Sequence, residues 1–275
     1  MWFNSLPAQP GKPDIRPDAP RKKGLPRLAE VLGRDLGSIG KAGLLVLAAC
    51  LPAGLLVSLA LLAESPPLVL LAAASAGWLT GPAMTSLYDT ILRALRDEPG
   101  YWWHTYRRAW KRSFRSSLLP GVAFTFLWSC LLYARLAAAP AGPLLLSAAY
   151  LTACSLYFWL QSALFENSSA QKLENCLRMA VGFLHRTLAA VAVQLLYLAI
   201  LPRLGFFGFL TGLWLPSLLA LMIVYPPLEH ALDLEAKIRQ VQTNRWFFSS
   251  LFFYTVCTKR AASENRAARF VAIRT

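Results

Sequence analysis

Long charge-free runs alternate with short charged segments along the chain. An α-helix rises about 1.5 Å per residue, so roughly 20 apolar residues cross the ~30 Å hydrocarbon core of a membrane. Pro143 marks the expected start of the fourth helix, and the fifth run lengthens backwards through 179–184 if Arg186 reaches the headgroups. We therefore predict an all-α, polytopic membrane helix bundle with six transmembrane helices. They are expected within 42–63, 65–88, 116–134, 136–165, 187–202 and 204–228.

The basic residues predict how this bundle is oriented. The chain has 28 Lys and Arg residues and a net charge of +14, and only Arg135 and Arg203 lie in the segments of one side. Cytoplasmic loops carry the excess of Lys and Arg, so both termini are predicted to be cytoplasmic in a multi-pass protein of the cell membrane. The positive charge is then expected to face the anionic inner leaflet of the lipid bilayer rather than nucleic acid.

Composition divides the rest of the chain. With 56% hydrophobic and 15% charged residues, the protein is too apolar for an ordinary soluble domain. Residues 1–27 are expected to form a disordered, Pro-rich basic arm, and 28–240 the six-span membrane domain. Residues 241–275 are expected to form a cytoplasmic tail with an interfacial apolar segment, because the run at 246–257 is too short to cross a membrane.

The stretch at 80–118 has the most distinctive pattern. Gly81 and Pro82 interrupt the second predicted span and indicate a kink, and 97–100 reads as a turn. An amphipathic helix follows, in which aromatic and basic residues interleave. These residues are Trp103, Tyr106, Arg107, Arg108, Trp110, Lys111, Arg112, Phe114 and Arg115. Such a cytoplasmic elbow helix is either a docking surface for a partner or lipid, or an anchor that holds the loop at the membrane.

This stretch resembles the YesL-like family of uncharacterised bacterial integral membrane proteins. Its members carry a G-P-A-x-x-x-L-Y segment at the end of a second span, then an acidic-Gly turn and a segment like R-A-F-K-x-N-F-x-x-S. The matching residues here are Gly81, Pro82, Ala83, Leu87, Tyr88, Arg108, Ala109, Trp110, Lys111, Phe114 and Ser117. Trp110 replaces the usual phenylalanine, and Ser113 replaces the usual asparagine.

The resemblance implies a six-span bundle and no assigned activity. Genes of the family often lie beside components of carbohydrate ABC transporters, which implies an accessory role in sugar uptake and a transporter subunit as a partner. The family offers no catalytic residue to carry over. The candidate functional motif is therefore drawn from the residues of this chain at the positions that carry the resemblance. These are Gly81, Pro82, Ala83, Leu87, Tyr88, Trp110, Lys111 and Phe114.

A second candidate site is polar. Gln161, Glu166 and Asn167 lie about one helical turn apart at the cytoplasmic end of the fourth predicted span. Glu166 is expected to pair with an arginine, either Arg93, Arg96 or Arg178. The alternative is an ordinary interfacial salt bridge with no further role. Gly205, Gly208 and Gly212 open the sixth predicted span at a spacing that favours close helix packing.

Signatures of catalysis are missing from the sequence. The three histidines, His104, His185 and His230, have no metal-ligand spacing, so no enzyme activity, metal or cofactor is expected. Two functions remain open: a non-enzymatic accessory protein that binds a partner, or a small-molecule transporter or channel. The second predicts a polar cavity that reaches Thr80, Gln161 or Gln194. The sequence leaves the oligomeric state open.

Overall fold

The computed structural model describes residues 24–63, 65–98, 101–136, 139–165 and 168–232, and these residues form α-helices and the turns between them. Most of the predicted arm at 1–27 and the whole predicted tail at 241–275 lie outside this part of the chain. The helices are α1 (Leu25–Leu62), α2 (Pro66–Leu95), α3 (Trp102–Leu136), α4 (Ala141–Leu164), α5 (Ser169–Gly182), α6 (Leu184–Thr211) and α7 (Trp214–Leu232).

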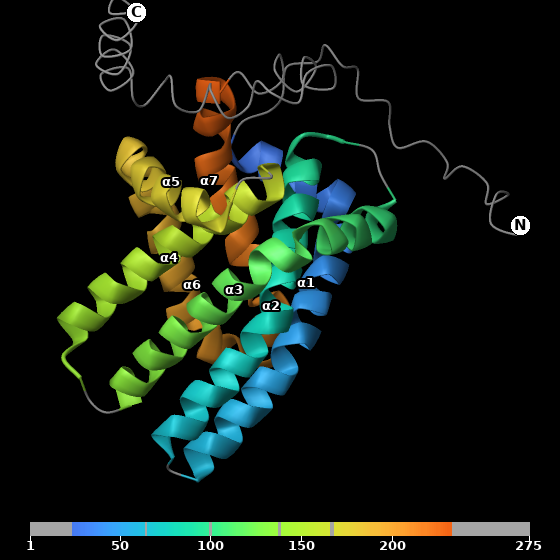
Figure 1. Cartoon of the computed structure of the whole chain (residues 1–275). Coiled ribbons are helices and arrows are strands. Elements are labelled where there is room, and N and C mark those ends of the chain that lie inside the picture. The colour runs from blue at the N-terminus through green and yellow to red at the C-terminus, as the bar shows by residue number, and fades with distance from the viewer. Residues whose placement is uncertain (1–23, 64, 99–100, 137–138, 166–167, 233–275) are drawn as a thin grey trace, which may run out of the picture.

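Antiparallel neighbours build the bundle (Figure 1). Helix α2 is its centre, because it packs most extensively against α3 and α1 and also contacts α4 and α7. Helix α5 is short and lies across one end. We call that end, where α1 begins and α2 ends, the basic end, and the other the opposite end. The start of α1 and the end of α7 both lie at the basic end (Figure 1).

Four helices are long and apolar enough to cross a membrane, by length and composition. Within the described residues these are Leu25–Leu56, Trp102–Arg135, Ala141–Leu164 and Leu184–Leu201, and Trp214–Glu229 is a shorter apolar helix. The predicted spans at 42–63, 116–134, 136–165 and 187–202 fall on the four. The predicted spans at 65–88 and 204–228 fall on α2 and on the α6–α7 region, outside them.

Helix α3 corrects the expected elbow. The amphipathic segment and the third predicted span are one continuous helix, which contains Pro120. Proline lacks the N–H that would bond the carbonyl four residues earlier, which here is that of Ser116. The Ser169 hydroxyl of α5 donates to this carbonyl at 3.0 Å instead. Helix α3 therefore passes through the proline because a neighbouring helix supplies the missing donor.

The last two helices also differ from the prediction. Helix α6 breaks at Gly205, whose φ of 54° and ψ of −130° are non-helical, and α7 begins at Trp214 rather than at residue 204. The expected close packing at Gly208 is local, because a Cβ there would meet Leu201 and Leu204 of the same helix. Near the end of α7, Pro227 leaves the Ile223 carbonyl without its helical donor. The Arg186 guanidinium donates to this carbonyl at 3.4 Å.

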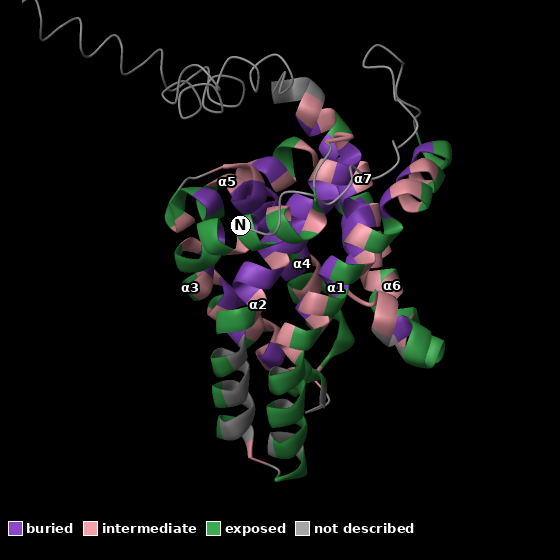
Figure 2. Ribbon diagram, turned by 90° about the vertical axis from the view of Figure 1, so that its right-hand side faces the viewer, coloured by how far each residue is buried: buried purple, intermediate pink, exposed green. Residues whose placement is uncertain are grey.

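The core is concentrated in the half of the bundle near the basic end (Figure 2). Helices α2, α4 and α7 supply most of its fully buried apolar side chains, whereas α1, α4 and α6 expose many leucines towards the opposite end. A side chain exposed at that end faces lipid if the helix lies in a membrane, so the exposure costs nothing there. The largest fully buried apolar side chains include Tyr88, Tyr157, Phe158, Leu87, Ile91, Leu92, Leu156, Leu160, Leu218 and Leu221.

Candidate functional site

Three glycines bring α2 and α3 into backbone contact. A Cβ at Gly77 would overlap the backbone of Val122, and one at Gly81 would overlap the Ser117 carbonyl oxygen. A Cβ at Gly121 would overlap the Gly77 carbonyl oxygen in return. We call Gly77, Gly81 and Gly121 the glycine seam. Gly81, expected to leave room for a kink beside Pro82, allows close packing of α2 on α3. Gly77 and Gly121 were not among the predicted site residues, although Gly77 and Gly81 have G-x-x-x-G spacing.

The first half of the candidate motif continues this seam into the core. Ala83 and Leu87 are fully buried and Tyr88 is 2% exposed. The Tyr88 hydroxyl interacts with the side chains of Ser217 on α7 and Gln194 on α6. This half of the motif therefore fixes α2 against its neighbours and offers no surface to a partner.

Two arginines of α1 close the end of α2. Asp97 has a left-handed φ of 60°, and the N–H groups of Asp97 and Glu98 bond back to the carbonyls of Ala94 and Arg93. This is a Schellman ending, which usually has glycine at the left-handed position. The Arg27 guanidinium donates to the Leu95 carbonyl at 2.9 Å and to the Asp97 carboxylate at 2.7 Å.

Arg34, seven residues further along α1, makes the same kinds of contact. Its guanidinium donates to the Ala94 carbonyl at 2.7 Å and also pairs with Asp97. Arg27 and Arg34 are seven residues apart and so share one helix face, a signal that could have been read from the sequence. Instead, Arg27 was placed in the arm, whereas α1 begins at Leu25. We call Arg27, Arg34 and Asp97 the arginine clamp.

The clamp also governs the ionisation of Asp97. Burial alone would raise the pKa of this carboxyl group, because it penalises the charged form. The hydrogen bonds and charges of Arg27 and Arg34 outweigh that penalty, so the pKa of Asp97 lies below its ordinary value. Asp97 is therefore ionised at neutral pH and holds α1 to the end of α2.

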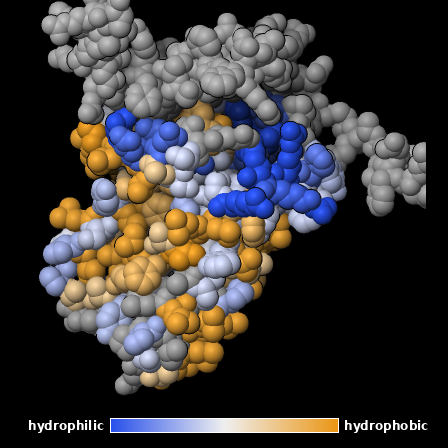
Figure 3. All heavy atoms as spheres, in the orientation of Figure 1, coloured by the Kyte–Doolittle hydropathy of each residue, from blue (hydrophilic) through white to orange (hydrophobic). Residues whose placement is uncertain are grey.

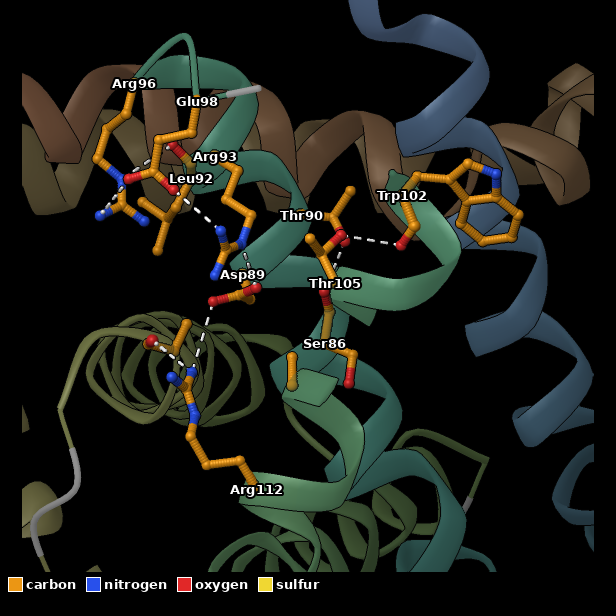
Figure 4. Close-up of polar contacts among 12 residues, drawn as sticks. Ser86, Asp89, Thr90, Leu92, Arg93, Arg96, Glu98, Trp102, Thr105 and Arg112 are labelled. Carbon is orange, nitrogen blue, oxygen red and sulfur yellow. Dashed lines mark hydrogen bonds and ion pairs between the residues drawn. The ribbon is translucent and has the colours of Figure 1, made fainter. Parts of the chain in front are cut away.

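A second carboxylate joins α2 to α3 and α4 (Figure 4). The side chain of Asp89 is 4% exposed and accepts from Arg93 at 2.8 Å and from Arg112 at 3.5 Å. Arg112 also donates to the Ala163 carbonyl at 3.0 Å, near the end of α4. Arg93 extends the network to Glu98 at 3.0 Å. Asp89 thus links three helices at the basic end. The i, i+4 spacing of Asp89 and Arg93 indicates this one pair from the sequence.

The beginning of α3, from Trp102 to Arg115, has two different faces, and we keep the name elbow for it. Tyr106, Ala109 and Ser113 are buried against the bundle, and Trp110 packs beside them. The other face is exposed, and hydrophilic residues gather over this region (Figure 3). Its exposed residues include Trp103, Arg107, Arg108, Lys111, Phe114 and Arg115. Lys111 and Phe114 of the candidate motif are therefore the members that reach the surface.

The second candidate site is placed only in part. Gln161 is buried, and its amide donates to the Lys172 carbonyl at 3.2 Å and to the Cys176 sulfur at 3.4 Å, while its own oxygen has no partner among the described residues. Burial, with a smaller contribution from Cys154, raises the pKa of Cys176 to about 12. Glu166 and Asn167 lie outside the described residues.

The three arginines expected near Glu166 each pair with a described carboxylate, and the predicted pairing with Glu166 itself lies outside the described residues. Arg93 pairs with Asp89 and Glu98, and Arg96 pairs with Glu98 at 3.1 Å. Arg178 pairs with Glu174 one turn away on α5, at 2.5 Å. Arg93 and Arg96 therefore join carboxylates at the end of α2, Arg178 joins one on α5, and Gln161 bridges α4 and α5.

A large cleft opens among the helices towards the opposite end. Its volume is about 1040 Å³, and its walls come from α1, α2, α3, α4 and α6. Thr80 and Thr125 both line it, and their hydroxyl oxygens are in direct contact at 3.2 Å. A smaller cavity of about 310 Å³ adjoins it, shares Trp128 and Trp159 with it, and includes Tyr88 and Gln194. Thr80 and Gln194 were both expected at a cavity; Gln161 lines neither.

The ionisable groups at these sites serve the contacts between helices. Among the described residues there is no group of three His, Cys, Asp or Glu side chains that could hold a metal ion. The buried carboxylates at Asp89 and Asp97 are paired with arginines that connect helices. What remains accessible is the elbow with its cations and aromatic rings, and the cleft.

Comparison with known proteins covers the same central region. No curated protein and no solved structure matches the chain. The arginines of the clamp on α1 lie outside the segment that a family model matches. That segment includes the glycine seam, Asp89, Asp97 and the elbow. Residues 71–134 match the family described as a protein of unknown function, DUF624.

Proposed function

We propose that the chain is a six-span membrane protein without enzymatic activity, which binds a protein partner through the elbow. Helices α1, α2, α3, α4 and α6 each run along the bundle and α7 returns the chain to the basic end, which supports six crossings (Figure 1). The positive-inside rule then makes the basic end cytoplasmic.

The exposed face of the elbow is the observation that carries the proposal. Arg107, Arg108 and Lys111 are exposed, whereas Arg112, four residues after Arg108, is used to join α2 and α4. Trp103 is 44% exposed and Phe114 is 39% exposed at the two ends of this face. Aromatic rings and arginines are enriched at protein interfaces, where rings fill pockets and guanidinium groups bind carboxylates.

The partner that fits this face presents carboxylates around an apolar pocket, close to the membrane surface. The YesL-like resemblance supports a membrane subunit of a carbohydrate ABC transporter as that partner. The elbow follows the end of α2 at the basic end of the bundle. It would therefore dock beside the cytoplasmic loops of the transporter.

Co-purification with such a transporter subunit tests the proposal. The chain and a membrane subunit of a carbohydrate ABC transporter are co-expressed, extracted in mild detergent and isolated through a tag on the subunit. Recovery of the wild-type chain is expected to fall at least about tenfold for Arg107→Ala/Arg108→Ala/Lys111→Ala, since each interfacial charge contributes on the order of 1 kcal/mol.

A charge-preserving variant is the matched control. Arg107→Lys/Arg108→Lys/Lys111→Arg keeps three cations and is expected to retain most of the binding. Equal recovery of the alanine and wild-type chains, or no recovery of either, would show that the elbow does not bind this partner.

A small-molecule transporter is the second candidate, and the cleft at Thr80 favours it. The cleft is open towards the opposite end, while the half near the basic end is filled by side chains. That arrangement fits one access state of a carrier. Uptake of a labelled sugar into vesicles containing only the purified chain would favour this function over partner binding, and its absence would count against it.

A further inference from the structure

We propose that the cleft binds an anionic phospholipid, whose acyl chains lie along its wall and whose phosphate pairs with Arg135. This site is independent of partner binding at the elbow, because the elbow and Arg135 are at opposite ends of α3. The occupant is inferred from three properties of the cleft: its position, its size and its charge.

The walls of the cleft have the character of the membrane interior. They are built by leucines of three helices, among them Leu132, Leu145 and Leu198, together with the rings of Trp128 and Trp159. All of them lie within helical segments that are long and apolar enough to cross a membrane. At that depth any peptide occupant must satisfy all its backbone groups internally, so an irregular peptide segment does not fit.

The size of the cleft argues against a transmembrane helix of a partner that is enclosed within it. A helix of ~10 Å diameter that spans ~30 Å occupies roughly 2400 Å³. The cleft holds about 1040 Å³, less than half of that volume. Acyl chains are thinner than a helix and bend to follow an irregular wall, so they fill such a space without separating the helices.

The polar groups in and beside the cleft are already engaged. Thr125 donates to the Gly121 carbonyl at 2.7 Å and Ser129 to the Thr125 carbonyl at 3.0 Å. Tyr88, at the inner cavity, interacts with Ser217 and Gln194. The interior therefore makes little demand for a polar ligand, and this favours hydrocarbon over a sugar or an ion.

Arg135 supplies the charge at the rim. It is exposed in the last turn of α3, lines the cleft and has no carboxylate partner among the described residues. A cation beside an apolar wall at the membrane surface matches a lipid whose phosphate carries negative charge. A zwitterionic lipid with the same chains would lose part of this attraction.

Photo-crosslinking in vesicles tests the site. The full chain is reconstituted with phosphatidylglycerol that carries a diazirine on its acyl chain, irradiated and digested, and the adducts are mapped by mass spectrometry. Adducts are expected to be enriched on cleft residues of α3, α4 and α6. Arg135→Gln is expected to reduce them about fivefold, the effect of one basic residue near an anionic surface.

Two matched controls separate specific binding from general contact with lipid. Arg203→Gln removes the other arginine of the same side, which does not line the cleft, and is expected to change nothing. Ala148→Phe fills the cleft and is expected to abolish the adducts, whereas Ala192→Phe on the exposed face of α6 is expected to leave them. Thermal unfolding of each variant confirms that it is folded.

The same experiment can overturn the proposal. Adducts spread evenly over all lipid-facing helices, or equally strong with Arg135→Gln and Ala148→Phe, would show general solvation only. Equal labelling by phosphatidylcholine of the same chain length would show that the net negative charge of the headgroup has no role, because that lipid carries the same phosphate and a compensating cation. Protection of the cleft by a crosslinked second copy of the chain would assign it to oligomerisation instead.

Discussion

Asp97 has a backbone conformation that disfavours its side chain, whereas the contacts of that side chain favour it. A left-handed φ favours glycine, and an aspartate there costs on the order of 1 kcal/mol. Its two arginine partners offset this cost, because hydrogen bonds between charged groups contribute about 1.5–3 kcal/mol each. The side chain at this position therefore matters more than the ease of the turn.

Substitution of Asp97 measures this balance. Asp97→Ala loses the carboxylate and keeps the strained φ, so it is expected to destabilise the protein by about 2–4 kcal/mol. Asp97→Gly loses the carboxylate but relieves the strain, so its cost should be smaller by ~1 kcal/mol. Thermal unfolding in detergent measures both. Glu174→Gln removes an exposed pair on α5 and should be near neutral; a glycine variant less stable than the alanine variant would contradict the assignment.

The clamp also predicts how stability depends on pH. The pKa of Asp97 is lower in the folded chain than its ordinary value near 3.9, so this carboxylate stabilises the fold above about pH 4. The contribution is lost as the pH falls through the lower, folded-state pKa. The unfolding temperatures of wild type and Asp97→Asn should therefore differ at pH 7, and the difference should shrink as the pH falls below about 4 towards the folded-state pKa. A difference that stays constant with pH would show that charge is not its source.

At the scale of the helices, the close backbone contact between α2 and α3 is the most extensive packing in the bundle. A Cβ at Gly81 would meet backbone atoms of Ser117 and Gly121, which cannot rotate away. Gly81→Ala should therefore cost about 1–3 kcal/mol, the usual effect of overpacking. Gly54→Ala in α1 is the control, since nothing lies within 4 Å of its added methyl group, and its helix propensity should improve. Equal unfolding temperatures for the two variants would mean that the helices separate freely.

The bond between α5 and α3 can be isolated by a double-mutant cycle. Ser169→Ala removes the donor to the Ser116 carbonyl and should cost ~1 kcal/mol. In a Pro120→Ala background the restored backbone N–H can serve that carbonyl, so the same change should cost less. Additive effects in the two backgrounds would show that the serine and the proline do not share this carbonyl.

At the scale of the whole molecule, the property to test is the predicted topology of six crossings. Six crossings place Gly142 outside the cell and Ala170 inside. In a chain without its native cysteines, Gly142→Cys should react with an impermeant thiol reagent in intact cells, whereas Ala170→Cys should react only after lysis. Reaction of Ala170→Cys in intact cells would reverse or renumber the spans.

Local sequence features predicted the helices well and their connections poorly. The charge-free runs located α1 to α4 and most of α6, because an apolar run of sufficient length has few alternatives in a membrane. The break at Gly205 and the passage through Pro120 depend on contacts with other helices, which no local pattern contains. The exposed face of the elbow followed from periodicity, but the partners of Asp97 lie more than sixty residues away on α1.

The bond from Ser169 to the Ser116 carbonyl has a consequence for biogenesis. The two residues are 53 positions apart, so ribosomal synthesis exposes the acceptor well before its donor exists. Ser116 is the first residue of the predicted third span, so water at the membrane surface can donate to its carbonyl until Ser169 has been made. Release of α3 into the bilayer therefore does not require α5, and a nascent chain stalled before Ser169 should no longer crosslink to the insertion machinery through α3.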